Sequence, residues 1–212
     1  MKLFYCILIS SLLSVHFCQA QIPVKVKAGA ARSNLRVDGS FQARPIATWY
    51  GGVATTLRMG KRFFFQPELL YSERGSDFRS SYALGNPTQI HRYGYISMPL
   101  LLGWHPFKKM SLLIGVEPGY MLWDRAKSNI YEHTYEDIVR HFDVDIDLGL
   151  AYQPLPRWTV EVRALAGMIG MYDQWGQSRM SVYTTGEHVG YHFIQQFGLS
   201  YDLKVKKNKG LR

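Results

Sequence analysis

Cysteine is nearly absent from this sequence: Cys6 and Cys18 are the only two among 212 residues. Both fall in an N-terminal stretch where a basic residue, an apolar run and small residues near Ala20 follow one another. This order is typical of a secretory signal peptide, so we predict a signal peptide over residues 1–20, cleaved before Gln21. The mature chain then has no thiol, which excludes disulfides, cysteine metal ligands and a cysteine nucleophile.

Long apolar runs are also missing. No later stretch approaches the roughly 18 consecutive apolar residues of a transmembrane helix. The longest runs are the short MPLLLGW and ALAGMIGMY. Aromatic residues nevertheless make up 14% of the chain, with 14 Tyr and 11 Phe. An exported, aromatic-rich chain without a hydrophobic helix leaves few fold classes open.

Motifs of catalysis and of nucleic-acid binding are lacking too. The formal charge is +9, but the basic residues are scattered, apart from the C-terminal KVKKNKGLR, and they form no concentrated patch. We therefore expect no nucleic-acid partner. The chain has neither G-x-S-x-G nor H-E-x-x-H, and none of its histidines lies in a recognisable nucleophile motif. We predict no enzyme activity, no catalytic residues and no cofactor.

Two acidic segments are candidates for metal sites. The run Asp143–Asp147 resembles the start of a calcium loop, but Leu148 and Pro154 stand where that loop needs glycine and glutamate. A second cluster could bind a metal but is more simply explained as a solvated loop: Glu132, His133, Glu136 and Asp137. We predict no metal site.

What the chain does contain is strict alternation. In FDVDIDLGLAY, residues 142–152, every even position is apolar, and three of the odd positions are aspartate. A period of two indicates an extended strand with two opposed faces. The same pattern predicts eight strands: Val24–Arg32, Ile46–Met59, Arg62–Ser76, Arg92–His105, Met110–Arg125, Arg140–Gln153, Trp158–Tyr172 and Val189–Leu203.

The connectors alternate between long and short. The short ones are Gly60–Lys61, Pro106–Lys109 and Pro154–Arg157, whereas the others run to a dozen residues or more: Ser33–Pro45, Asp77–His91, Ala126–Val139 and Asp173–His188. An up-and-down meander puts all the long loops at one end and all the short turns at the other. Outer-membrane barrels show this asymmetry, with long loops outside the cell and tight turns in the periplasm.

Side-chain volume indicates which face is inside. The apolar faces carry bulky Phe, Leu, Ile, Tyr and Trp, too large together for the interior of eight strands, while the polar faces are rich in Gly, Ala and Ser. We therefore predict an all-β fold, an eight-stranded antiparallel up-and-down transmembrane β-barrel, with lipid on the apolar face. The alternative is a soluble, lipocalin-like ligand carrier, in which the faces are reversed.

The same register predicts two sets of site residues. Inward-facing charges should pair with one another, because isolated buried charge is costly; this polar lumen network comprises Lys25, Lys27, Arg58, Glu68, Arg74, Glu117, Asp143, Asp145, Asp147, Glu161, Arg163 and Asp202. Closure of the barrel should bring Lys25 and Lys27 near Asp202. Aromatic residues at strand ends predict the two girdles of a membrane barrel: Trp104, Trp123, Tyr152, Trp158, Tyr172, Tyr191 and Tyr201.

Three segments resemble the PorT-like outer-membrane β-barrel family: FFFQPELLYSERGSDF (Phe63–Phe78), YGYISMPLLLGWHPF (Tyr93–Phe107) and SLLIGVEPGYML (Ser111–Leu122). The resemblance implies an eight-stranded barrel in the outer membrane and says little about activity; the family's namesake takes part in protein secretion. One departure is the C-terminus, where eleven residues follow Tyr201 although such barrels commonly end on an aromatic residue.

Together these features predict three segments: a signal peptide (1–20), an outer-membrane β-barrel (21–203) and a basic periplasmic tail (204–212). The expected function is non-enzymatic, with a plugged polar lumen and a role in surface binding, adhesion or envelope structure. The alternatives are a component of a secretion apparatus and the soluble carrier. The expected partners are outer-membrane lipid and a protein in the envelope or at the cell surface.

Overall fold

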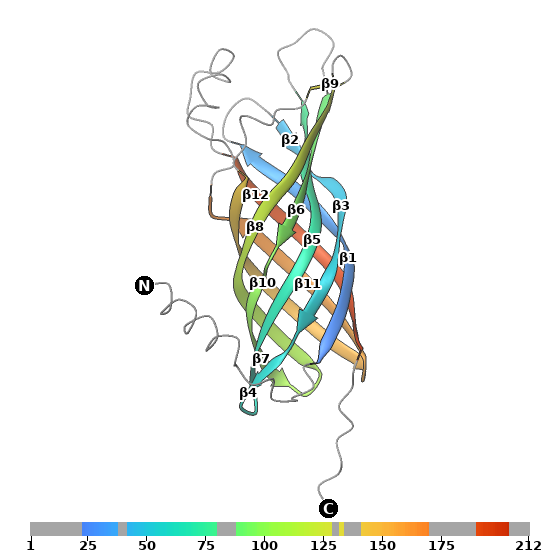
Figure 1. Ribbon diagram of the computed structural model, residues 1–212, viewed down its shortest axis with the longest axis vertical. Helices are drawn as coiled ribbons and strands as arrows, with labels where there is room; N and C mark the ends of the chain where they lie inside the picture. Colours follow the sequence, from blue (N-terminus) through green and yellow to red (C-terminus); the bar gives the residue numbers. More distant parts are fainter. Residues whose placement is uncertain are drawn as a thin grey trace, which may run out of the picture.

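The computed structural model describes residues 23–37, 42–79, 88–128, 132–133, 141–169 and 190–203. In these residues all regular structure is β, in one antiparallel sheet that closes on itself through the pairing of β10 with β8. The strands are β1 (Val24–Val37), β2 (Gln42–Arg44), β3 (Ile46–Thr55), β4 (Leu57–Met59), β5 (Phe63–Arg79), β6 (Thr88–Ser97), β7 (Leu100–Phe107), β8 (Met110–Ser128), β9 (Glu132–His133), β10 (Phe142–Leu155), β11 (Trp158–Gly167) and β12 (Gly190–Asp202). Figure 1 shows these strands wound around the barrel at a steep tilt.

The barrel wall consists of eight strands, some of which are interrupted along their length. The segments β3 and β4 are one wall strand interrupted at Thr56, since both pair with β5. The segments β6 and β7 are another, since both lie between β5 and β8. Pro99 explains this second interruption, because proline has no amide hydrogen to donate to a neighbouring strand. The predicted eight-stranded antiparallel barrel is confirmed.

The tight turns gather at one end of the barrel, hereafter the turn end. They lie at residues 60–62, 108–109 and 156–157, and Gly60 adopts a φ of 81°, which favours glycine. The short strands β2 and β9 lie at the opposite end, the loop end, while β4 lies at the turn end (Figure 1). The sorting of connectors seen in the sequence thus has its counterpart in the two ends of the barrel.

Several strands differ in length from the prediction. The first strand continues beyond its predicted end at Arg32 to Val37, because alternation persists through residues predicted to form a loop. Similarly, β5 and β8 extend to Arg79 and Ser128. In contrast, β11 ends at Gly167, and the rest of its predicted range, from residue 170 on, lies outside the described residues.

The apolar face of the sheet is outside. On β10, Phe142 and Leu148 are 54% and 52% exposed, whereas Asp145 and Asp147 between them are fully buried. Phe197 on β12 is 60% exposed. A soluble carrier would bury these side chains, so the lipocalin-like alternative is wrong.

No helix within the described residues has the length and apolar character needed to cross a membrane.

Candidate functional site: the charged lumen of the barrel

The interior of the barrel is filled in layers. Near the turn end, Phe64, Leu101, Leu113 and Ala151 form an apolar cluster, and near the loop end a second cluster consists of Leu35, Tyr93, Tyr95 and Met121. Between them, a third group packs against one side of the wall: Ala31, Tyr50, Leu70, Leu165 and Ile194. Leucines that interrupt the polar face in the sequence therefore serve as interior packing.

Three buried cations lie between the two apolar ends. Lys27 on β1, Arg74 on β5 and Arg163 on β11 are each at most 2% exposed. Lys27 Nζ lies 2.6 Å from Glu68 Oε1 and 2.5 Å from Glu161 Oε1. Each cation thus has carboxylate partners from more than one strand, which is the arrangement that makes buried charge tolerable.

Two glutamates connect the three cations into one network. Glu68 contacts Lys27 and also accepts a hydrogen bond from Arg163 Nη1 at 2.9 Å. Glu117 uses its two oxygens separately, with Oε1 2.8 Å from Arg74 Nη2 and Oε2 3.2 Å from Arg163 Nη2. Because these residues come from four different strands, the network crosses the lumen from wall to wall.

The aspartates of β10 complete the network on one side. Arg74 Nη1 donates to Asp145 at 2.6 Å and to Asp143 at 3.2 Å. Asp147 pairs with Arg163, whose Nε donates to Asp147 Oδ1 at 3.1 Å. Alternation along one strand therefore aims all three aspartates at the two arginines.

Carboxylates outnumber cations in this network. Six acidic side chains (Glu68, Glu117, Asp143, Asp145, Asp147 and Glu161) share three basic ones, and all nine are at most 4% exposed. Each cation is therefore shared by several acids, and the loss of a cation would leave more charge unbalanced than the loss of an acid.

Three predicted lumen residues lie elsewhere. Lys25 and Asp202 are register partners near the turn end, 4.0 Å apart and partly exposed. Lys27 does not join them as expected, since its side chain reaches Glu68 and Glu161 across the lumen instead. The prediction of a lumen position was wrong for Arg58. This residue lies on β4, beside the turn, and is exposed to solvent because the chain has passed the end of the lumen there.

Two uncharged side chains extend the network. Tyr50 Oη donates to Glu161 Oε1 at 3.4 Å, and Gln66 Nε2 donates to Glu68 Oε1 at 2.6 Å. The Tyr50 ring lies over Gly29 on β1, and its hydroxyl reaches Gly198 on β12, where an added side chain would collide with it. Sequence reasoning missed both residues because it considered charged side chains only, although their parity along the strand already indicated the interior.

Histidine also enters the lumen. His192 is buried on β12, with Nε2 3.8 Å from Asp143 Oδ2 and its ring edge-on to Tyr95. Within the described residues, no group of three or more His, Cys, Asp or Glu side chains is arranged to hold a metal ion. The acidic loop cluster at residues 132–137 lies outside what the structure describes, apart from the backbone of Glu132 and His133.

The turn-end girdle residues lie on the outer wall. Trp104, Tyr152 and Trp158 are 37%, 47% and 39% exposed. The Trp158 ring packs 4.8 Å from that of Tyr201, whose hydroxyl accepts a hydrogen bond from Arg157. Their exposure on the outer wall agrees with an interfacial girdle, which stays a prediction.

At the other end, Tyr191 is 39% exposed and Trp123 faces outward although it is out of phase with its strand. A β-bulge explains this: Gly94 pairs with Trp123 and Tyr95 with Met121, which leaves Leu122 without a partner residue and reverses the alternation beyond it. Two further rings were not predicted, Trp49 and Tyr71, which pack together. Tyr172 lies outside the described residues.

A closed barrel with an apolar outer wall, aromatic rings near both ends and a charged interior has the organisation of a membrane-spanning β-barrel. Residues 17–173 match the family model described as "Outer membrane protein beta-barrel domain". The chain belongs to this outer-membrane β-barrel family. Its location is the outer membrane, and its outer wall contacts lipid. The narrower resemblance to the PorT-like group stays a prediction.

Solved structures of small outer-membrane barrels share the fold. Neisserial surface protein A superposes with a TM-score of 0.53 at 9% identity, over 85% of this chain and 97% of that one. Ail, the attachment invasion locus protein of Yersinia pestis, in complex with the heparin analogue sucrose octasulfate, gives a TM-score of 0.50 at 12% identity, over 86% and 99%. Among curated proteins, none matches this sequence. At these identities the likeness concerns the fold alone.

Proposed function

We propose that this protein is a non-enzymatic outer-membrane barrel with a closed lumen, and that it binds an anionic ligand at the cell surface. The observation that carries the proposal is a pair of arginines on the part of the wall that extends toward the loop end. The closed lumen argues against a role as a channel, and the extended wall supplies the binding surface.

The filling of the lumen supports the first half of the proposal. Arg74 and Arg163 are tied to carboxylates on opposite walls, and apolar clusters pack above and below them. Opening a path for solutes would require several buried ion pairs to break together, which is costly. Eight strands leave room for side chains and little more.

The long strands support the second half. A transmembrane strand needs about 9–11 residues, whereas β5 has 17 and β8 has 19. The excess continues toward the loop end, where β8 pairs with β6 and β9 (Figure 1). These extensions form a sheet that stands above the lipid-facing part of the barrel.

Basic side chains meet on this extension. Arg92 and Arg125 are direct cross-strand partners on β6 and β8. Like charges directly opposite each other destabilise a sheet, and of the two only Arg92 has an ion-pair partner among the described residues, Glu73 at 2.6 Å. Arg125 lies over the ring of Trp123, and Lys127, two residues further, is exposed on the same face. An anionic ligand would relieve this repulsion.

The chemical class of the ligand is proposed by comparison with Ail, whose structure was solved in complex with a heparin analogue, sucrose octasulfate. Sulfated or otherwise polyanionic glycans have the charge that Arg92, Arg125 and Lys127 would attract. We therefore propose this class of ligand for the present chain. The comparison suggests the class, and the cross-strand arginine pair of this chain supplies the positive charge that would bind it.

Binding to immobilised heparin tests the proposal. The purified protein should be retained, and the double variant Arg92→Gln/Arg125→Gln should elute at clearly lower salt because it loses one exposed charge and one that is partly exposed. The matched control, Arg62→Gln/Arg157→Gln, removes two exposed charges at the turn end and should elute like the unchanged protein. Equal elution of both variants would contradict a binding site on the extension.

Conductance across a planar lipid bilayer tests the closed lumen separately. The inserted protein should give no sustained current steps. Steady single-channel currents from the unchanged protein would show that the lumen is open and would remove the first half of the proposal.

A further inference from the structure

One polar pair lies on the lipid-facing wall. Arg32 on β1 and Gln195 on β12 are register partners, both exposed on the outside of the barrel. Arg32 Nη1 donates to Gln195 Oε1 at 3.5 Å. Their neighbours on the same faces are Ala30 and the largely exposed Phe197, so the pair interrupts an otherwise apolar surface.

The depth of this pair follows from strand geometry. Tyr191 and Tyr201 lie ten residues apart on β12, which at a rise of roughly 3.3 Å per residue and a tilt of roughly 40° places them about 25 Å apart along the barrel axis. That is about the height of the apolar band of an outer-membrane barrel. Gln195 is four residues from Tyr191, or about 10 Å inside the girdle at the loop end. The pair therefore belongs to the leaflet on the loop side.

A guanidinium at this depth needs an anionic partner or a route to the interface, because a charge facing lipid is unfavourable. Arg32 is long enough to reach toward the headgroups while its methylene groups remain in the apolar layer. Its planar group matches the oxygens of a phosphate, and the amide nitrogen of Gln195 can donate to the same phosphate.

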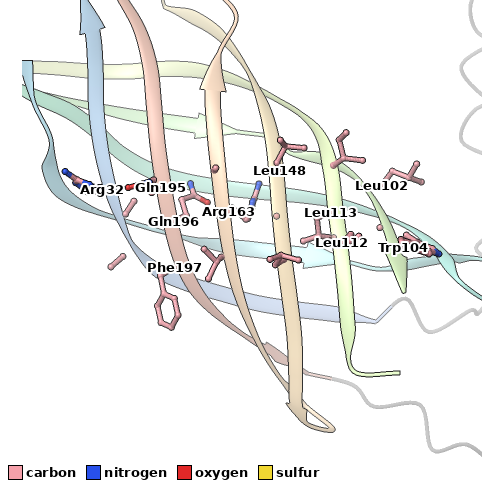
Figure 2. Close-up of a pocket in the computed structure, with 18 of the residues that line it drawn as sticks. Arg32, Leu102, Trp104, Leu112, Leu113, Leu148, Arg163, Gln195, Gln196 and Phe197 are labelled. Carbon is pink, nitrogen blue, oxygen red and sulfur yellow. Dashed lines mark hydrogen bonds between the residues drawn. The ribbon is translucent and has the colours of Figure 1, made fainter. Parts of the chain in front are cut away.

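Next to the pair, the wall is hollowed. A hollow of about 1160 Å³ crosses the outer surface over β1, β12, β11, β10, β8, β7 and the start of β5. Figure 2 shows Arg32 and Gln195 at one end of it and Leu102 and Trp104 at the other. Side chains such as Phe197 and Leu148 make most of its lining apolar. The apolar part of the hollow beside Arg32 suits acyl chains that extend from a headgroup held there.

We propose that this hollow is a fixed binding site for one class of membrane lipid, an anionic lipid of the loop-side leaflet whose phosphate is held by Arg32 and Gln195. The charge of Arg32 selects the anionic headgroup, and the apolar hollow holds the chains. The proposal depends on the outer-membrane location of the barrel and not on the ligand proposed for the extended strands.

Native mass spectrometry of the full protein, extracted from outer membranes in detergent, tests the site. Phosphatidylglycerol and phosphatidylcholine with identical chains serve as probes. The unchanged protein should retain phosphatidylglycerol in clear preference. Arg32→Gln should reduce that preference by about tenfold, as expected for the loss of a charge-assisted hydrogen bond. Arg157→Gln, which removes an exposed charge at the turn end, should keep the full preference.

A shift in gel mobility on boiling shows that each variant is folded, and Arg32→Lys, which retains the charge, should keep part of the preference. Equal retention of both lipids by the unchanged protein would overturn the proposal, and so would an unchanged preference in folded Arg32→Gln. A dimer that Arg32→Gln abolishes, without any lipid preference, would also overturn it and assign the pair to contact between two copies of the chain.

Discussion

Removing a cation from the lumen should cost much more stability than removing a carboxylate. Arg163→Met keeps an unbranched, flexible apolar side chain and removes the guanidinium and its charge from a residue that is 1% exposed. Glu68, Glu117 and Asp147 would each lose a partner. Breaking a buried ion pair on one side costs about 3–5 kcal/mol, so we expect the free energy of unfolding to fall by at least that amount.

The corresponding loss for Glu117→Gln should be smaller, about 1–2 kcal/mol. Arg74 retains Asp143 and Asp145 in this variant, and Arg163 retains its other two partners. The two losses of stability differ because six acids share three cations. Removing one carboxylate leaves each cation with other partners, whereas removing one cation leaves several carboxylates without one of theirs.

Urea titration of the protein in phosphatidylcholine vesicles, followed by the fluorescence of its five tryptophans, measures both values. The matched control is Arg157→Met, since Arg157 is exposed and donates to the hydroxyl of Tyr201 at 3.1 Å. It should change stability by less than about 1 kcal/mol. The reasoning is refuted if Arg163→Met costs no more than the control, because the buried acids would then not depend on the cation.

Four further outcomes are expected. Phe64→Ala should lower the free energy of unfolding by about 3–5 kcal/mol, because a buried ring near the turn end leaves a cavity; urea titration measures this value. Gly198→Leu should abolish the shift in gel mobility on boiling that marks a folded barrel, since its side chain would occupy the position of the Tyr50 hydroxyl. N-terminal sequencing of the protein from outer membranes should begin at Gln21, and any other start would contradict the predicted cleavage. If the protein serves secretion as its PorT-like resemblance implies, deleting residues 204–212 should block export of client proteins while the barrel still inserts, and normal export would count against that role.

Much of the barrel could be predicted from local pattern. Parity along a strand separates its two faces and side-chain volume indicates which face is inside, which is why the sequence alone places the aspartates at 143, 145 and 147 in the interior. The same rule failed for Arg58, because parity says which face a residue occupies and nothing about whether the strand still borders the lumen there. Parity also could not explain the outward position of Trp123. The bulge at Leu122 that reverses the alternation there arises from the pairing of β8 with β6.

The partners within the lumen could not be predicted in the same way. Lys27 and Asp202 are expected to be close because the first and last strands are neighbours, yet Lys27 reaches Glu68, 41 residues away, on the strand beyond β3. Arg163 and Glu68 are separated by 95 residues. Such contacts depend on the stagger of the strands and on the width of the closed barrel, neither of which is encoded in any single strand.

The sequence by itself determined the strand period, the faces, the sorting of connectors and the export signal that we predict, because each of these depends on residues close together in the chain. Only the tertiary structure decided which cation meets which carboxylate, where the apolar clusters pack inside the barrel, and that Arg32 and Gln195 meet on the lipid side. The physical reason is that closing the sheet sets distances across the barrel, and buried charge is stable only where those distances bring opposite charges into contact.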